Sequence, residues 1–114
     1  MKVAIIGSRS ISSVELKNYV TEGDELVSGG AIGVDRCVAE YAQQKGVKLT
    51  QFLPQYERYG RAAPILRNRE IVEYADKVVA FWDGKSKGTY SVIEYAKKQG
   101  KPCQVVLCSI ERNC

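Results

Sequence analysis

The chain has 114 residues, of which 45% are hydrophobic and 26% charged, and this is the composition of one ordinary globular domain rather than of a disordered segment. No apolar run approaches the roughly 18 residues that a membrane helix needs, and the first expected strand begins at Lys2, which leaves no room for a signal peptide; we expect a cytoplasmic protein that does not bind membranes. The formal net charge of +4 is too small to indicate nucleic-acid binding by itself.

Short apolar runs alternate with segments of helical periodicity along the chain. In chain order, the sequence predicts a first strand that begins at Lys2 and has its apolar run at 3–6, a helix at 12–20, a strand at 25–28, a helix at 34–45 and a strand at 47–53. A basic loop at 55–61, a helix at 64–74 and a strand at 77–82 follow. The last two elements are a helix that carries Val92, Ile93 and Ala96 inward and a strand at 104–107. This alternation predicts right-handed βαβ units. We therefore expect an α/β fold, a Rossmann-like three-layer αβα sandwich with a parallel sheet of about five strands, in a single domain over residues 1–114.

Histidine is absent, which excludes Ser–His and Cys–His nucleophile pairs and a histidine general base. The cysteines Cys37, Cys103, Cys108 and Cys114 form no C-x-x-C pair, and the spacing of Cys103 and Cys108 directs them to opposite faces of a strand. We therefore expect no metal site, and we interpret the cysteines as unpaired small hydrophobic residues of a reducing compartment.

Three loops that leave the expected strands are rich in glycine and small residues, namely Gly7–Ser10, Ser28–Asp35 and Asp83–Thr89. Glycine lets the backbone approach a ligand, and a helix N-terminus behind such a loop attracts phosphate. Because the carboxyl ends of parallel strands share one edge of the sheet, three loops that also carry Arg9, Lys85 and Lys87 favour an anion site there. The alternative is turn chemistry alone, since many strand-to-helix turns use glycine.

Two common phosphate motifs are absent. The segment Gly7–Ser12 does not match G-x-G-x-x-G, and Gly84–Ser86 imitates the end of a P-loop whose first glycine position is occupied by Val79. We therefore expect neither a standard NAD site nor a kinase-type ATP site, and no cofactor.

Several residues near these loops allow two interpretations. Asn68 shares a helical stripe with Ile65, Val72 and Ala75, so it is expected to point toward the sheet, either as a satisfied core asparagine or, with Arg67, as a ligand contact.

Asp35 in a first helical turn is either a helix-dipole partner or a functional acid. The rings of Trp82 and Tyr90 either stack on a base or pack in the core. The loop at 55–61 interleaves tyrosines with arginines, which suits single-stranded DNA or simply covers an edge of the sheet.

These segments resemble the SLOG superfamily, the Rossmann-like group of the DNA-processing protein A domain and the LOG proteins, and within it the small stand-alone YspA-like branch. The resemblance is carried by Gly7-Ser8-Arg9, by Ser28-Gly29-Gly30-Ala31 through Gly33-Val34-Asp35, by Arg67-Asn68, and by Ala75-Asp76 through Phe81-Trp82-Asp83-Gly84, Ser86 and Gly88-Thr89. It implies a homodimer and a pocket for a nucleotide or a nucleotide-derived ligand such as ADP-ribose. The implied ligand-binding residues are Gly7, Ser8, Arg9, Gly29, Gly30, Arg67, Asn68, Asp83, Ser86, Gly88 and Thr89.

The LOG enzymes in this superfamily cleave the base from nucleoside 5′-monophosphates and carry the motif P-G-G-x-G-T-x-x-E. Here Gly88-Thr89 match, but Ser91 and Val92 occupy the places where the acid is expected. We therefore expect a binding or sensing module rather than an enzyme. The alternatives are a phosphoribohydrolase that uses Asp35, Asp83 or Glu94 as acid or base, and a single-stranded DNA-binding protein.

Overall fold

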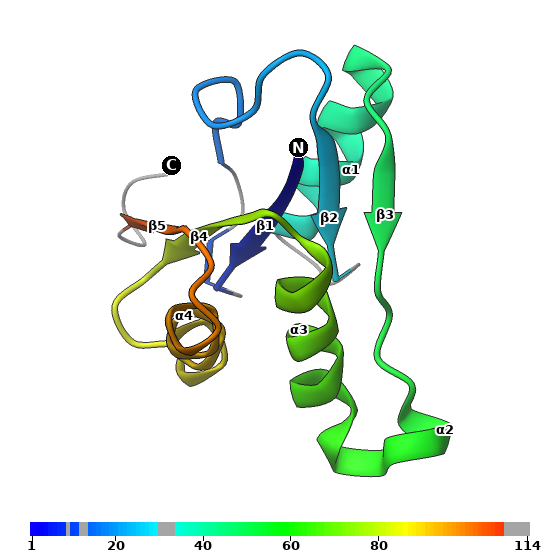
Figure 1. Ribbon diagram of the computed structural model, residues 1–114, viewed down its shortest axis with the longest axis vertical. Coiled ribbons are helices and arrows are strands. Elements are labelled where there is room, and N and C mark those ends of the chain that lie inside the picture. Colours follow the sequence, from blue (N-terminus) through cyan, green and yellow to red (C-terminus); the bar gives the residue numbers. More distant parts are fainter. Residues whose placement is uncertain (9, 12–13, 30–33, 109–114) are drawn as a thin grey trace.

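The computed structural model describes residues 1–8, 10–11, 14–29 and 34–108 (Figure 1). It contains a five-stranded, all-parallel sheet in the order β3-β2-β1-β4-β5. The strands are β1 (Lys2–Gly7), β2 (Glu25–Ser28), β3 (Leu49–Gln51), β4 (Lys77–Trp82) and β5 (Cys103–Leu107). The predicted α/β, Rossmann-like class is therefore confirmed.

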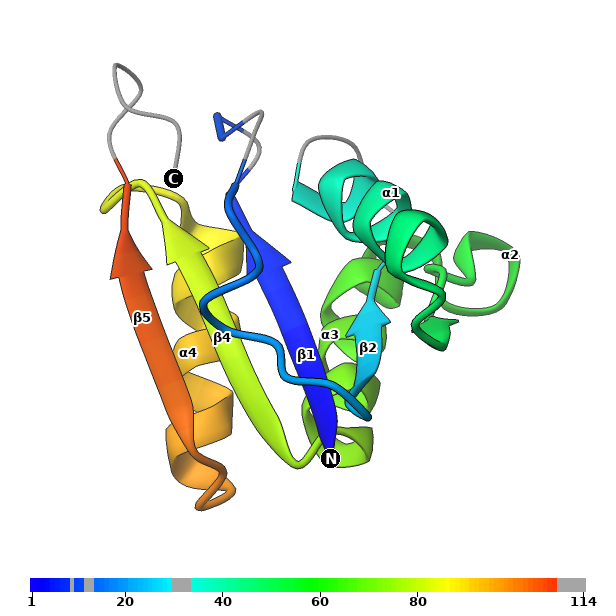
Figure 2. The same ribbon diagram turned by 90° about the horizontal axis from the view of Figure 1, so that it is seen from above.

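Helices lie on both faces of the sheet, α1 on one face and α3 and α4 on the other (Figure 2). The helical elements are α1 (Val34–Lys45), α2 (Tyr56–Tyr59), the 3₁₀ turn η1 (Gly60–Ala62), α3 (Ala63–Tyr74) and α4 (Lys87–Lys98). Local sequence explains the ends of two of them. Pro64 occupies the first turn of α3, where its missing N–H costs nothing, and Gly46 follows α1 with a positive φ of 66°.

The central strands are buried on both sides. Along β1, Val3 and Ile5 pack toward α1, whereas Ala4 and Ile6 pack toward α3 and α4. A strand covered on both faces has no solvent-facing positions, which is why β1 and β4 are continuous apolar runs in the sequence. This packing fixes where the carboxyl ends of the strands, and the loops after them, come together.

The helix expected at 12–20 is wrong for the part that the structure describes, since residues 14–20 contain no helix. Leu16 and Val20 are nevertheless buried against the face that α1 covers, and Tyr19 N–H donates to the Leu16 carbonyl in a turn. Val14, Tyr19 and Val20 have restricted side-chain rotamers in a helix, so packing on the sheet decides the local conformation instead. On this face the outer layer is therefore α1 plus an irregular segment.

Three further expectations need correction. The strand predicted at 47–53 is shorter in the structure and consists of the three residues of β3. The segment predicted as a loop at 55–61 contains α2 and the start of η1. Cys103 is a free thiol, but Cys108 is disulfide-bonded, against the expectation of unpaired thiols. Within the described residues no group of cysteine, aspartate and glutamate side chains could hold a metal ion. None of the described helices has the length and apolarity needed to cross a membrane.

Candidate functional site

A cavity of about 360 Å³ opens at the carboxyl edge of the sheet, and we call it the edge cavity. It lies between the carboxyl ends of β1 and β4. The chain places β2 and β3 on one side of β1 and then β4 and β5 on the other side, and ligands of parallel α/β sheets bind at this switch in strand order. Eight of the predicted ligand-binding residues line it, namely Gly7, Gly29, Arg67, Asn68, Asp83, Ser86, Gly88 and Thr89. Ser8 does not line it but is buried next to the lining residue Thr89, whereas Arg9 and Gly30 lie outside the described residues.

The three glycines of the edge cavity differ in what a side chain would meet. A Cβ on Gly7 would lie 2.8 Å from Val34 Cγ1 and closer still to two other atoms of Val34. A Cβ on Gly29 would lie 2.6 Å from Nη1 of Arg67, but nothing lies within 4 Å of the place for a Cβ on Gly88. Gly7 and Gly29 therefore make room for the protein's own side chains, and Gly88 exposes its backbone to the cavity.

Arg67 places a half-buried positive charge beside the cavity. Its Nη1 donates to the Gly29 carbonyl at 2.7 Å, and its Nε donates to Asn68 Oδ1 at 2.8 Å. Both partners are neutral, and no carboxylate of the described chain pairs with this guanidinium. The remaining N–H donors of the guanidinium are therefore suited to an anion.

The first turn of α4 adds backbone donors to the same cavity. The first N–H groups of a helix have no partner inside the helix, and their dipoles favour negative charge. Ser86 stands at the N-cap, but its side chain makes no cap hydrogen bond. The N–H groups of Lys87, Gly88 and Thr89, in the first turn of α4, therefore have no side-chain cap. Gly88 and Thr89 lie in the wall of the cavity.

Asp83 organises the loop that leads into α4. Its Oδ1 accepts from the N–H groups of Lys85 and Ser86 at 2.8 and 2.7 Å, and its Oδ2 accepts from the Ser10 hydroxyl at 2.6 Å. These hydrogen bonds, the one from Ser10 first, lower the pKa of Asp83 from 3.8 to about 2. An ionised carboxylate with both oxygens engaged shapes the loop and has no proton to donate at neutral pH.

A buried hydroxyl pair ties β1 to α4 under the cavity. Ser8 Oγ and Thr89 Oγ1 lie 3.1 Å apart, and Asp83 N–H donates to Ser8 Oγ at 3.3 Å. Ser8 and Thr89 are 1% and 3% exposed, so these hydroxyls have little water to bond with instead. The pair holds the first turn of α4 against the end of β1.

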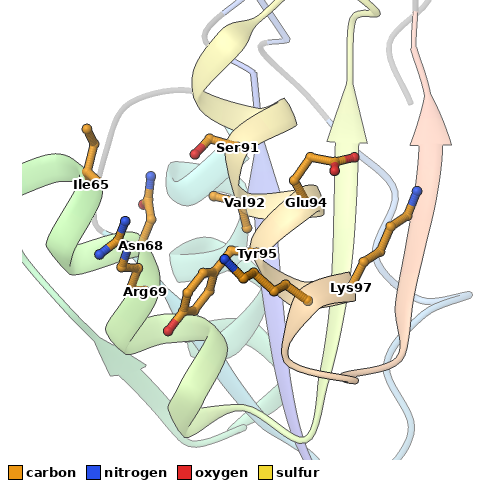
Figure 3. Close-up of a pocket in the computed structure, with 9 residues that line it drawn as sticks. Ile65, Asn68, Arg69, Ser91, Val92, Glu94, Tyr95 and Lys97 are labelled. Carbon is orange, nitrogen blue, oxygen red and sulfur yellow. The ribbon is translucent and has the colours of Figure 1, made fainter.

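The three carboxylates considered as catalytic groups are not brought together. Asp35 and Asp83 both line the edge cavity, from α1 and from the end of β4. Glu94 lines a separate cavity of about 550 Å³ between α3 and α4, which we call the helix groove (Figure 3). A mechanism that needs Glu94 beside either aspartate is therefore not supported by this arrangement.

Some predicted placements near the site are wrong, and some lining residues were missed. Ile65, expected inward, is 51% exposed, and Asn68 is half-buried between the two cavities rather than in the core. Ser10 and Pro64 line the edge cavity and were not predicted. Ser10 belongs to the glycine-containing loop Gly7–Ser10 but was not among the predicted ligand-binding residues, and nothing in the sequence around Pro64 marks it as a site residue.

Comparison of the chain with protein-family models, with curated proteins and with solved structures finds no match. The SLOG superfamily therefore remains a resemblance carried by the residues quoted above. What the chain does has to be inferred from the edge cavity itself.

Proposed function

We propose that the chain binds or senses a nucleotide or nucleotide-derived ligand, such as an ADP-ribose-like molecule, through a phosphate held in the edge cavity. The observation that carries this proposal is Arg67, a half-buried guanidinium with only neutral partners that lines the same cavity as the uncapped first turn of α4. A side-chain cation and a helix N-terminus that line one cavity are both favourable to a phosphate. The cavity volume of about 360 Å³ is within the range of small-molecule sites.

The lining of the cavity also fits the rest of a nucleotide. Of its apolar lining residues, Ile6 is 9% exposed and can contact a sugar or base, whereas Ile71 and Val92 lie behind it in the core. Asn68 accepts from Arg67 with its oxygen, and no described residue accepts from its amide N–H groups, so these remain for ligand oxygens. The resemblance to the SLOG superfamily supports the same ligand class and a homodimer, and a cytoplasmic location stays a prediction from the sequence.

A hydrolytic role is the second candidate, because Asp35 lines the same cavity as the proposed phosphate site. General acid–base catalysis needs a carboxyl that can exchange a proton near neutral pH. Asp83 does not meet this need, since its pKa is about 2. Binding without turnover is therefore the function that the cavity supports better.

A thermal-shift screen of AMP, ADP-ribose and dinucleotides tests the proposal. A ligand at 100 times its Kd stabilises the folded state by about 2.7 kcal/mol, which raises the Tm of a domain of this size by roughly 10 °C. Arg67→Lys keeps the charge but loses the planar fork, so we expect about tenfold weaker binding. The matched control is Arg36→Lys, at an exposed position on α1.

Three results separate the candidates. No shift with any phosphorylated compound, or equal shifts for the parent and Arg67→Lys, contradicts the proposal. Free base released from AMP and lost in Asp35→Asn supports the hydrolase. Salt-sensitive binding of oligonucleotides but not of mononucleotides supports the DNA-binding protein. Arg9, outside the described residues, stays a prediction from sequence that Arg9→Ala tests in the same screen.

A further inference from the structure

The helix groove adjoins the edge cavity, because Asn68 and Val92 line both. Its remaining lining along α4 extends from Ser91 to Lys98 (Figure 3). At 1.5 Å per residue, the two cavities together follow α4 for about 18 Å from Ser86 onward. One elongated ligand can therefore occupy both.

The helix groove is positively charged. Arg69, Lys97 and Lys98 line it against Glu94, and Glu73, which accepts a hydrogen bond from Tyr95, adds a second negative charge beside it. The surrounding half of the chain has the same bias, since the segment from Pro54 to Lys101 has ten lysines and arginines against six acidic residues. The whole formal charge of +4 is therefore found on the segment that builds α3 and α4, and a negatively charged group is favoured in the groove.

The helix groove also contains a fixed aromatic ring. Tyr95 extends from α4 toward α3 (Figure 3), and its hydroxyl donates to Glu73 Oε2 at 3.3 Å. The Arg69 guanidinium lies 5.6 Å from the centroid of the Tyr95 ring. A tyrosine ring beside an arginine is a surface on which a planar base or a sugar packs next to a phosphate.

We propose that the natural ligand has two nucleotide-like units: the edge cavity holds the first, and the helix groove holds a second sugar–phosphate unit with Arg69, Lys98 and Tyr95. This inference rests on the proposed function of the edge cavity and adds a second subsite to it. Asn68 stands at the junction, where its free amide donors face the linkage between the two units. Two linkages between nucleotide units fit this position, namely the pyrophosphate of a dinucleotide and the phosphodiester at the end of a nucleic-acid strand.

The test compares the Kd values of AMP, ADP-ribose and the 5′-phosphorylated diadenylate pApA by isothermal titration calorimetry. We expect at least one two-unit compound to bind the parent about tenfold more tightly than AMP, which corresponds to one charge-assisted hydrogen bond. Tighter binding of ADP-ribose than of pApA indicates a pyrophosphate linkage, and the reverse order indicates a strand end.

Arg69→Ala and Arg69→Ala/Lys98→Ala should remove the tighter binding of the two-unit compound relative to AMP and leave the Kd of AMP itself unchanged. Arg36→Ala removes the same charge from the opposite face of the sheet, so it should retain the advantage. Equal Kd values for AMP and both longer compounds contradict the second subsite. It is also contradicted if the tighter binding of the longer compounds, relative to AMP, is unchanged in both Arg69→Ala and Arg69→Ala/Lys98→Ala. Failure of all three compounds to bind is a failure of the proposed function instead.

Discussion

Alanine substitutions at Gly7 and Gly88 should have opposite effects on stability, although both glycines line the edge cavity. A Cβ on Gly7 would overlap Val34, which is 1% exposed and begins α1, so neither residue can move without disturbing the core. Overpacking of this kind costs about 1–3 kcal/mol. A Cβ on Gly88 meets nothing within 4 Å, and alanine is favoured over glycine in a helix by up to about 1 kcal/mol.

Urea denaturation of the two variants measures this difference. We expect the free energy of unfolding to fall by about 1–3 kcal/mol for Gly7→Ala and to stay equal or rise by up to about 1 kcal/mol for Gly88→Ala, with unchanged m-values. The Gly88→Ala protein should nevertheless bind AMP more weakly, because its methyl group occupies space next to the proposed phosphate. A Gly7→Ala protein as stable as the parent would contradict the close packing of Gly7 in β1 against Val34 in α1.

Three further outcomes are expected. Thr89→Val removes the hydroxyl partner of Ser8 and should lower the free energy of unfolding by about 1–2 kcal/mol in urea denaturation; no loss would contradict a buried bond. Asp83 has a folded-state pKa of about 2 against an ordinary value of 3.8, so its carboxylate stabilises the fold above pH 3.8 and loses this effect as the pH falls toward 2. The stability difference between the parent and Asp83→Asn should therefore shrink over that range, and a constant difference would contradict the assigned hydrogen bonds. Asn68→Leu should weaken AMP binding while costing about 1 kcal/mol of stability or less, since Asn68 is only half-buried, and a larger loss would place it in the core.

The sheet and three of its helices could be predicted from the sequence because each leaves a strong local signal. Strands β1 and β4 are continuous apolar runs, and α1 combines a helical stripe with Gly46 after its end. The segment at 12–20 has a helix-start signal, but Leu16 and Val20 are buried on the sheet, with Val14 and Tyr19 packed beside them, without a helix. Local propensity was outweighed there by tertiary packing.

The candidate site was predicted in composition but not in the roles of its members. Eight of the predicted residues line one cavity because the loops after parallel strands meet at one edge. Sequence could not show that Gly7 makes room for Val34 or that Gly29 makes room for Arg67, since these partners are distant along the chain. The exposure of Ile65 was missed because α3 and α4 leave the helix groove between them.

The most direct test of the central claim is a ¹H–¹⁵N NMR titration of the protein with AMP. If a phosphate binds between Arg67 and the first turn of α4, the largest shifts should occur at the amides of Gly29, Gly88 and Thr89 and at the Arg67 Nε–H group. The amides of Gly46 and Gly100, which end α1 and follow α4 outside the edge cavity, should stay in place. Shifts that are absent, or that appear only at positions remote from the cavity, would contradict the account.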